Sequence, residues 1–212
     1  MKSPTTPRRS YNAAGRRAAA ERSRHAVVLA CRDLLIKDGY QATTIRAVAE
    51  RAGVSPEMIY KAFGGKQQLM KAVYDVTLAG DLEPNPMAQR AMVMRVQQPP
   101  DPRERIELIA KFVRDFHDRL GGILTVLTEA DPEVAEVRAT TENERLADVR
   151  AFVARLASEG HLRPTTSVAL ATDACWTLTS PQVFNQLTQA RSWSPDTYQQ
   201  WLAEMLMVTL LP

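Results

Sequence analysis

Side chains suited to binding a polyanion are concentrated between residues 44 and 66. Judged from residue type and helix face, the candidates for contact with a nucleic acid are Arg46, Glu57, Tyr60, Lys61 and Lys66. Hydroxyl groups and cations bind phosphate oxygens and fix the position of a nucleic acid, and Arg and Lys also read guanine edges. A carboxylate such as that of Glu57 can accept a hydrogen bond from the amino group of cytosine, but phosphate repels it. The segment therefore predicts contacts with a phosphate backbone and with base edges.

The charge distribution agrees with this interpretation. Residues 1–72 hold 14 Lys and Arg against 5 Asp and Glu, whereas residues 73–212 hold 13 against 19. A basic segment of this size is a candidate electrostatic footprint for nucleic acid. Basic surfaces are also common where they only face solvent, so charge alone leaves both explanations open.

The candidate residues fall on two short helices with a tight turn between them. Ile45, Val48, Ala49 and Ala52 mark one face of the first helix, and Thr43 or Thr44 is available as its N-cap. Gly53 ends this helix. A second helix starts at Ser55-Pro56, a capping serine followed by a proline in the first helical position. Two short helices joined by a glycine turn are typical of a helix-turn-helix, whose second helix enters the DNA major groove.

The second short helix has two distinct faces. At about 100° per residue, Ile59, Ala62 and Phe63 cluster on one side, and Glu57, Tyr60 and Lys61 point away from them. The first set is expected to pack on the neighbouring helices and the second set to face DNA. Arg46 could reach the backbone or a base edge, and Lys66, at the start of the next helix, is a candidate phosphate clamp.

Helical periodicity continues through the whole chain and predicts an all-α fold. A helix over 21–38 ends at Gly39, with Cys31 interpreted as a core residue. Gly64-Gly65 precedes a helix over 66–79, and residues 80–101 are expected to form a connection around one short helical piece. The further helices are predicted over 102–120, 123–130, 132–158, 164–178 and 196–210, with a break at Gly121-Gly122.

The stretch TTIRAVAERAGVSPEMIYKAFGGKQQLM resembles the DNA-binding signature of the TetR family of transcriptional regulators. The matching features are the threonine pair, Val48-Ala49, the Ala-Gly-Val-Ser turn at 52–55, Ile59-Tyr60, Phe63, Lys66 and Leu69. The likeness extends more loosely to the C-terminus, where Trp176 precedes Thr179-Ser180-Pro181. It implies an N-terminal three-helix DNA-binding head over 20–66 after a basic flexible arm over 1–19. A helical effector-binding and dimerisation domain would follow over 67–212, with 67–80 as the connecting helix.

The resemblance also implies roles for individual residues. Thr44, Ser55, Pro56, Tyr60 and Lys66 occupy places that contact DNA in such proteins, with Tyr60 and Lys66 on phosphates. Many relatives have glycine and threonine where Glu57 and Met58 stand here, so Glu57 either contacts a base or only favours the helix dipole. The arm, with its Lys and Arg residues, either follows DNA or is a solubilising tail.

Two sets of residues are candidates for the functions of the second domain. The candidate ligand pocket consists of Phe112, Phe116, His117, Leu127 and Trp176, although aromatic residues at helical spacing are commonly core. The candidate dimer interface is the stripe Tyr198, Trp201, Leu202 and Met205, whose alternative is the core of the single chain. A pocket of this composition favours a medium-sized, largely apolar or aromatic ligand.

These features predict a homodimeric repressor that binds a palindromic double-stranded DNA operator and responds to a small-molecule effector. The alternative is a constitutive or architectural DNA-binding protein without an effector. No phosphate-binding loop, metal-ligand spacing or nucleophile motif is present, so neither an enzyme nor a cofactor is predicted. No apolar run approaches the ~18–20 residues of a membrane span, and two distant cysteines fit a reducing cytoplasm.

Overall fold

The computed structural model describes residues 13–79, 98–127 and 131–212. All regular structure in these ranges is helical, which confirms the all-α prediction. The N-terminal helices are α1 (Ala13–Ala42), α2 (Ile45–Ala52), α3 (Pro56–Phe63) and α4 (Lys66–Ala79). The remaining elements are α6 (Pro102–Val126), α7 (Pro132–Ser158), α8 (Val168–Leu178), α9 (Pro181–Asn185), the π-helical segment η2 (Gln186–Ala190) and α10 (Pro195–Leu210).

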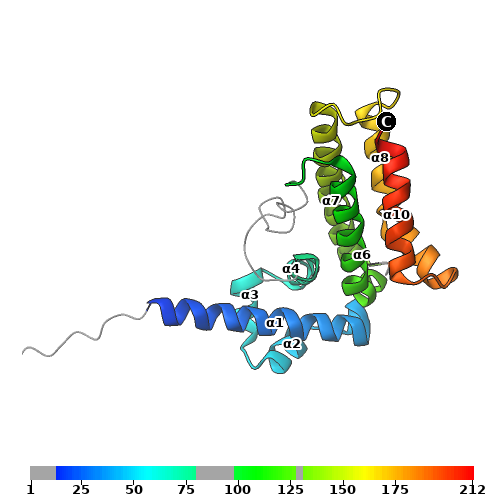
Figure 1. Cartoon of the computed structure of the whole chain (residues 1–212). Helices are drawn as coiled ribbons and strands as arrows, with labels where there is room; N and C mark the ends of the chain where they lie inside the picture. Colours follow the sequence, from blue (N-terminus) through cyan, green and yellow to red (C-terminus); the bar gives the residue numbers. More distant parts are fainter. Residues whose placement is uncertain (1–12, 80–97, 128–130) are drawn as a thin grey trace, which may run out of the picture.

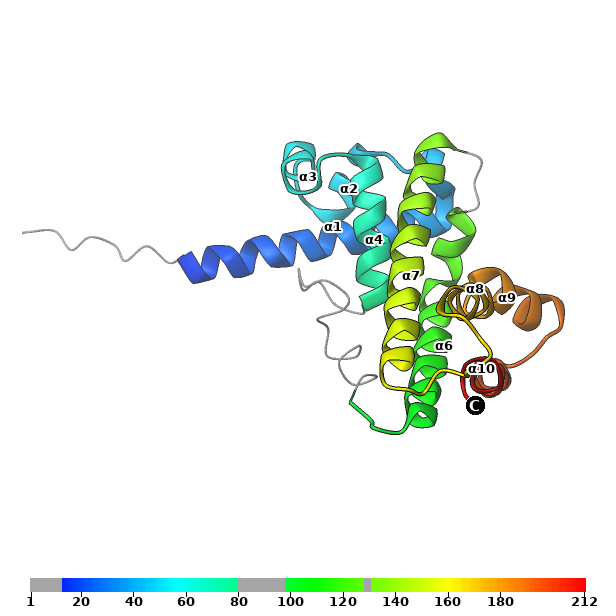
Figure 2. The same cartoon turned by 90° about the horizontal axis from the view of Figure 1, so that it is seen from above.

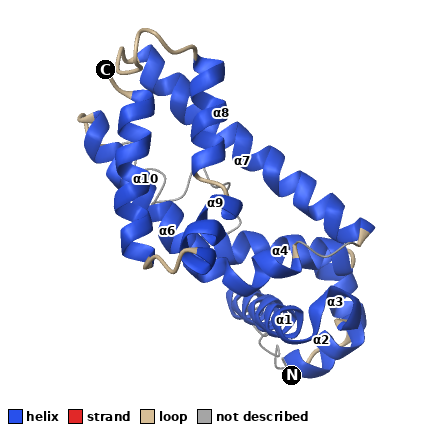
Figure 3. Cartoon of the chain, turned by 90° about the vertical axis from the view of Figure 1, so that its right-hand side faces the viewer, coloured by secondary structure: helices blue, strands red, loops and turns tan. Residues whose placement is uncertain are grey.

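The helices form a head and a body. Helices α1 to α3 lie across one end of the molecule, and α6, α7, α8 and α10 stand upright beside them (Figure 1). Helix α4 runs between α1 and the first half of α7 when the molecule is seen from above (Figure 2). Figure 3 shows the same separation, with α1, α2 and α3 at one end and α8 and α10 at the other.

The hydrophobic core continues from the head into the body. One cluster unites α1, α2, α3 and α4 with Phe116, Leu120 and Ile123 of α6 and with Val134 and Val137 of α7. A second cluster joins the first half of α6 to α7, α8 and α10. Because head residues share a core with α6 and α7, movement of either body helix must be felt by the head.

The local start signals act as the sequence predicts. Thr44 caps α2 by accepting a hydrogen bond from the Ala47 N–H (3.1 Å), and Ser55 caps α3 by accepting one from Met58 (3.3 Å). Gly53 ends α2 in the left-handed conformation (φ 67°), where a side chain would be strained. The N-terminal ends of both short helices and the C-terminal end of α2 are therefore defined by contacts within a few residues.

The predicted break at Gly121-Gly122 is wrong, because α6 continues through both glycines to Val126. A Cβ atom at Gly122 would lie 2.8 Å from Cγ2 of Ile36, so the glycine lets α1 and α6 approach closely. Two helix starts also differ from the prediction. Helix α1 begins at Ala13, inside the predicted arm, and α8 begins after its N-cap Ser167 and not at Pro164.

Two short elements near the C-terminus have no counterpart in the prediction, namely α9 and η2. The short helical piece expected within 80–101, and the arm up to residue 12, lie outside the described residues. None of the helices in the described ranges has the combination of length and apolar character that crossing a bilayer requires. Cys31 and Cys175 are buried free thiols, which confirms the interpretation of Cys31 as a core residue.

Candidate nucleic-acid interface

Helix α3 presents a polar outer face above a buried inner one. Ile59 is completely buried and packs into the core of the head, while Tyr60 is 55% exposed. Glu57 and Lys61 are also exposed. This is the arrangement expected of a helix that contributes one face to the core and offers the other to a groove of DNA.

Two arginines of the head fix α2 and the C-terminal end of α3 to α1. Arg24 of α1 donates to the carbonyl oxygen of Ala62 (2.7 Å), and its guanidinium lies 4.5 Å from the centre of the Phe63 ring. In α2, Arg51 pairs with Asp33 of α1 (3.1 Å). Arg24 and Arg51 therefore serve the fold of the head, although their charge type alone would suggest DNA contact.

The remaining predicted DNA-binding residues lie near the two helix starts. Thr44 and Arg46 are exposed at the beginning of α2, and Ser55 and Pro56 begin α3. The side chains of Thr44 and Ser55 already accept capping hydrogen bonds, so the Thr44 hydroxyl proton remains available for a phosphate oxygen. The Glu57 carboxyl has a lowered pKa because it is hydrogen bonded to its own backbone N–H and to Ser55. That contact supports the helix-start explanation of Glu57.

Lys66 has a partner that the sequence did not reveal. Its Nζ atom lies 3.9 Å from the centre of the Tyr40 ring, and Tyr40 in turn donates a hydrogen bond to Glu133 at the start of α7. Tyr40 and Glu133 are 93 residues apart, so no local pattern could have paired them.

Three of the predicted pocket residues lie together in an aromatic cluster. Phe112 stacks on Phe116 (centroids 6.2 Å apart), and His117 lies against both Phe116 (5.1 Å) and Phe184 (4.9 Å). Leu127 belongs instead to the core that continues into the head. Phe184, on the unpredicted helix α9, was missed because only the fold brings it to His117.

His117 is a fully buried neutral histidine. Burial lowers the pKa of His117 to about 4, with a smaller effect from the nearby Arg145 cation. Because the Thr179 carbonyl accepts from Nε2 (3.1 Å), the other ring nitrogen, Nδ1, carries a lone pair. In the described part of the chain, neither Nδ1 of His117 nor Nε1 of Trp176 finds a hydrogen-bond partner.

Arg145 of α7 links Trp176 to Thr179, the residue whose carbonyl oxygen accepts from His117. It donates to the carbonyl oxygen of Trp176 (2.7 Å) and to Oγ1 of Thr179 (3.2 Å), and its guanidinium lies 4.7 Å from the Trp176 ring centre. It also forms an ion pair with Glu142 (2.7 Å). Arg145 could not be recognised from the sequence, because a lone arginine on a charged helix shows no distinguishing pattern.

The predicted dimer stripe needs a correction. Tyr198 and Leu202 are completely buried within the single chain, so they offer no surface to a partner. Trp201 and Met205 are partly exposed, and Val208 of the same helix is 65% exposed. On the adjacent helix α8, Leu170 is 62% exposed. The apolar surface of these helices is thus turned by part of a helical turn from the predicted stripe.

Comparisons with known proteins agree with the sequence and the fold. Residues 27–73 match the family described as bacterial regulatory proteins, tetR family. No curated protein sequence matches the chain.

Solved structures of bacterial regulators share the fold over most of the chain. NalD, the secondary repressor of the MexAB-OprM multidrug efflux pump in Pseudomonas aeruginosa, is 23% identical, with a TM-score of 0.69; the match covers 91% of this chain and 98% of NalD. TylP, a TetR regulator from Streptomyces fradiae, is 20% identical, with a TM-score of 0.65 and coverage of 92% and 89%. FadR from Bacillus subtilis, solved with stearoyl-CoA, is 15% identical, with a TM-score of 0.65 and coverage of 86% and 96%. Residues 27–73 thus resemble the tetR family of bacterial regulatory proteins, and the structural likeness shows that the chain has the fold of these solved regulators.

Proposed function

We propose that this chain is a homodimeric transcriptional repressor that binds a palindromic operator, and that a medium-sized, largely apolar or aromatic small-molecule ligand either releases it from the operator or keeps it there. The observation that carries the proposal is the outer face of α3, where Glu57, Tyr60 and Lys61 are exposed above the buried Ile59. It is supported by the family match over residues 27–73. The domains then follow the predicted division, with the head up to about residue 66 and the effector and dimerisation domain after it.

Dimerisation has a functional reason in this proposal. Two recognition helices held about 34–36 Å apart can read successive major grooves of a palindrome. The surface that supports dimerisation is the apolar face of α8 and α10, made by Leu170, Trp201, Met205 and Val208. Trp201 is braced there by edge-to-face contact with Trp193 (centroids 6.0 Å apart).

The effector is proposed to bind beside His117 and Trp176. A buried polar group without a hydrogen-bond partner lowers the stability of the fold by roughly 1–3 kcal/mol. This region holds two such groups, one acceptor and one donor. The lone pair of His117 Nδ1 accepts and the Trp176 N–H donates, so an apolar ligand that carries a hydroxyl group satisfies this chemistry. Stearoyl-CoA bound to FadR shows a large acyl ligand on the same fold. A thermal-shift screen in which only small polar metabolites raised the melting temperature would contradict this ligand class.

The first test is selection of genomic fragments of the source organism by the purified protein at physiological salt. Enrichment of a palindrome near a few promoters is expected, and the neighbouring genes would narrow the ligand class. Equal recovery of unrelated fragments would instead favour an architectural protein, because non-specific binding depends on charge and not on sequence.

A single substitution tests the phosphate contact. Lys66→Ala is expected to weaken binding to operator and to unrelated DNA by similar factors. It should also reduce the slope of log affinity against log salt by about one, since one phosphate contact is lost. Fluorescence anisotropy at several salt concentrations measures both quantities. Lys111→Ala is the matched control, because Lys111 is an exposed lysine of the body helix α6. A changed sequence preference in Lys66→Ala would show that this residue reads bases.

A further inference from the structure

Tyr40 connects the head to the body through two different parts of its side chain. The flat face of its ring holds the Lys66 ammonium at 3.9 Å, and its hydroxyl group donates to the Glu133 carboxylate. The residue is only 1% exposed and lies just after Gly39, where the backbone of α1 departs from helical geometry. Lys66 begins α4 and Glu133 lies in the first turn of α7, so a single buried ring touches three helices.

The two contacts of Tyr40 reinforce each other. A cation is attracted to the negative face of an aromatic ring. Donation of the hydroxyl proton towards a carboxylate increases the electron density of that ring and thereby strengthens the attraction. Burial raises the pKa of the Tyr40 phenol, and the hydrogen bond to Glu133 raises it further, so the phenol stays protonated and remains a donor. The position of Glu133 thus acts on Lys66 through Tyr40.

The contact with the Tyr40 ring restricts the Lys66 side chain to one orientation. A free lysine side chain loses considerable rotamer freedom when it is fixed on a phosphate. The Tyr40 ring holds the ammonium on one side, and the N–H groups that point away from the ring stay available. The ring therefore prepares Lys66 for a phosphate oxygen at a lower entropic cost.

Neighbouring contacts show that α7 supports the head along several turns. Gln41 donates to Asp131, Gln67 to Glu136 (2.7 Å), and Lys71 pairs with Glu144 (2.8 Å). In each of these contacts the donor belongs to the head or to α4, and the acceptor lies on α7 or at its N-cap. A displacement of α7 therefore affects all of these contacts.

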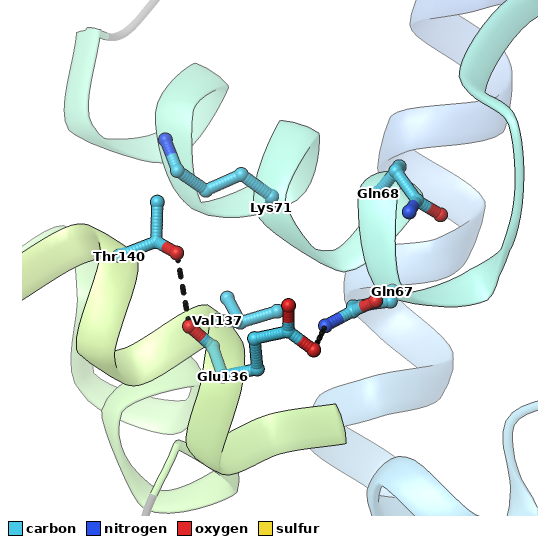
Figure 4. A pocket seen from close by; sticks show the side chains of 6 residues that line it. All are labelled: Gln67, Gln68, Lys71, Glu136, Val137 and Thr140. Carbon is cyan, nitrogen blue, oxygen red and sulfur yellow. Dashed lines mark hydrogen bonds between the residues drawn. The ribbon is translucent and has the colours of Figure 1, made fainter. Parts of the chain in front are cut away.

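The interface between α4 and α7 is not closely packed everywhere. A cleft of about 190 Å³ separates the helices and is lined by Gln67, Gln68, Lys71, Glu136, Val137 and Thr140. Figure 4 shows the hydrogen bond from Gln67 to Glu136 crossing this cleft. Most of the lining side chains are polar, and the core residue Val137 forms its apolar wall, so part of the contact between α4 and α7 is made by polar groups across open space.

We infer that Tyr40 is a positioning residue that couples Lys66 to α7, so that the place of Glu133 sets how firmly Lys66 is held for DNA. This inference rests on the proposed function, in which Lys66 binds phosphate. It makes the N-terminal end of α7 a control point for DNA affinity, although Glu133 itself belongs to the body.

The test depends on the direction in which DNA affinity changes, because simple electrostatics predicts the opposite direction. Removing an acidic residue from a DNA-binding protein favours DNA through charge alone. In contrast, Glu133→Ala is expected to weaken binding of the selected operator by about three- to tenfold. This factor lies within the range of coupling found between residues that contact the same neighbour. Tyr40→Phe keeps the ring but removes the hydroxyl group, and it is expected to weaken binding by a similar factor.

Glu136→Ala is the matched control. It removes the same charge from the same helix one turn later, but it touches Gln67 and not Tyr40. Its operator affinity is expected to stay within about twofold of the wild type or to increase. Equal effects of Glu133→Ala and Glu136→Ala would overturn the inference.

A double-mutant cycle separates this coupling from general loss of structure. In a Lys66→Ala background, Glu133→Ala is expected to cause no further loss of affinity, because the residue through which it acts is gone. Additive losses would overturn the inference. If Lys66→Ala alone binds DNA like the wild type, the phosphate assignment of the proposed function fails instead.

A second measurement needs no DNA. Lysines of the free protein are acetylated with a small activated ester and followed by peptide mass spectrometry. Lys66 is expected to react more slowly than the exposed Lys61, and Glu133→Ala and Tyr40→Phe are each expected to raise the rate at Lys66 about threefold without changing that at Lys61. An unchanged Lys66 rate in both variants would overturn the inference, whether or not the protein binds DNA.

Discussion

Val208→Arg is expected to convert the proposed dimer into a monomer and to lower operator affinity by about a hundredfold or more. Val208 is 65% exposed on α10, beside the exposed Leu170 of α8. In a two-fold symmetric interface the same patch occurs on both chains, so one substitution introduces two arginines into a single apolar contact. Burying two like charges in this apolar contact would be costly.

The loss of affinity follows from the geometry of the operator. In a dimer, binding of the first head brings the second head to its half-site at a high effective concentration, and a monomer loses this gain. Light scattering measures the mass of the variant, and anisotropy measures its affinity for the selected operator. Because a single head retains its phosphate contacts, the variant should still bind weakly at low salt.

Leu146→Arg provides the control for Val208→Arg. Leu146 is also an exposed apolar residue of the body (38%), but it lies on α7 and not on the face of α8 and α10. This variant is expected to remain dimeric and to bind the operator like the wild type. A Val208→Arg protein that stays dimeric would locate the interface on another surface.

The head could be predicted from sequence because its signals are local. Thr44, Ser55 and Gly53 define the ends of α2 and α3 through contacts within a few residues, and Ile59 follows from helical spacing alone. The chemistry of a cap or a left-handed glycine does not depend on the rest of the fold. These features were therefore predicted with correct boundaries.

The body depends on contacts that sequence spacing does not contain. Gly121-Gly122 has the composition of a helix break, yet Gly122 serves the close approach of Ile36 on α1. The apolar stripe of α10 indicated one buried face, but periodicity cannot distinguish packing within the chain from packing on a partner. Tyr198 and Leu202 were predicted to pack on a partner, but they are buried within the single chain.

Acidification is expected to destabilise the protein through His117 before its carboxylates are protonated. Burial lowers the pKa of His117 to about 4, whereas the unfolded chain has the ordinary value near 6.5. Between these values the unfolded state binds a proton that the folded state does not. Stability therefore decreases as the pH falls, and the loss from pH 7 to pH 5 is about 2 kcal/mol.

The carboxylates contribute in a different range. Asp33 and Asp115 have lowered pKa values because arginines or lysines donate hydrogen bonds to them, against the opposing effect of burial. Their stabilisation is present above the unfolded pKa and is lost only as the pH falls below it. The pKa of Asp148 is instead raised by burial and by the nearby Glu144, which makes its contribution to stability increase as the pH falls. A loss of stability between pH 7 and pH 5 therefore has the sign expected of His117 and not of Asp148.

His117→Phe removes the titrating group and keeps a ring of similar shape between Phe116 and Phe184. Urea unfolding at several pH values is expected to show that this variant loses about 2 kcal/mol less than the wild type between pH 7 and pH 5. His25→Phe, on the exposed side of α1, is the control that removes a histidine outside the core. The same pH slope in His117→Phe and in the wild type would show that the acid-sensitive proton binds elsewhere. The Nδ1 lone pair would then not be the buried acceptor to which we assign the ligand hydroxyl group.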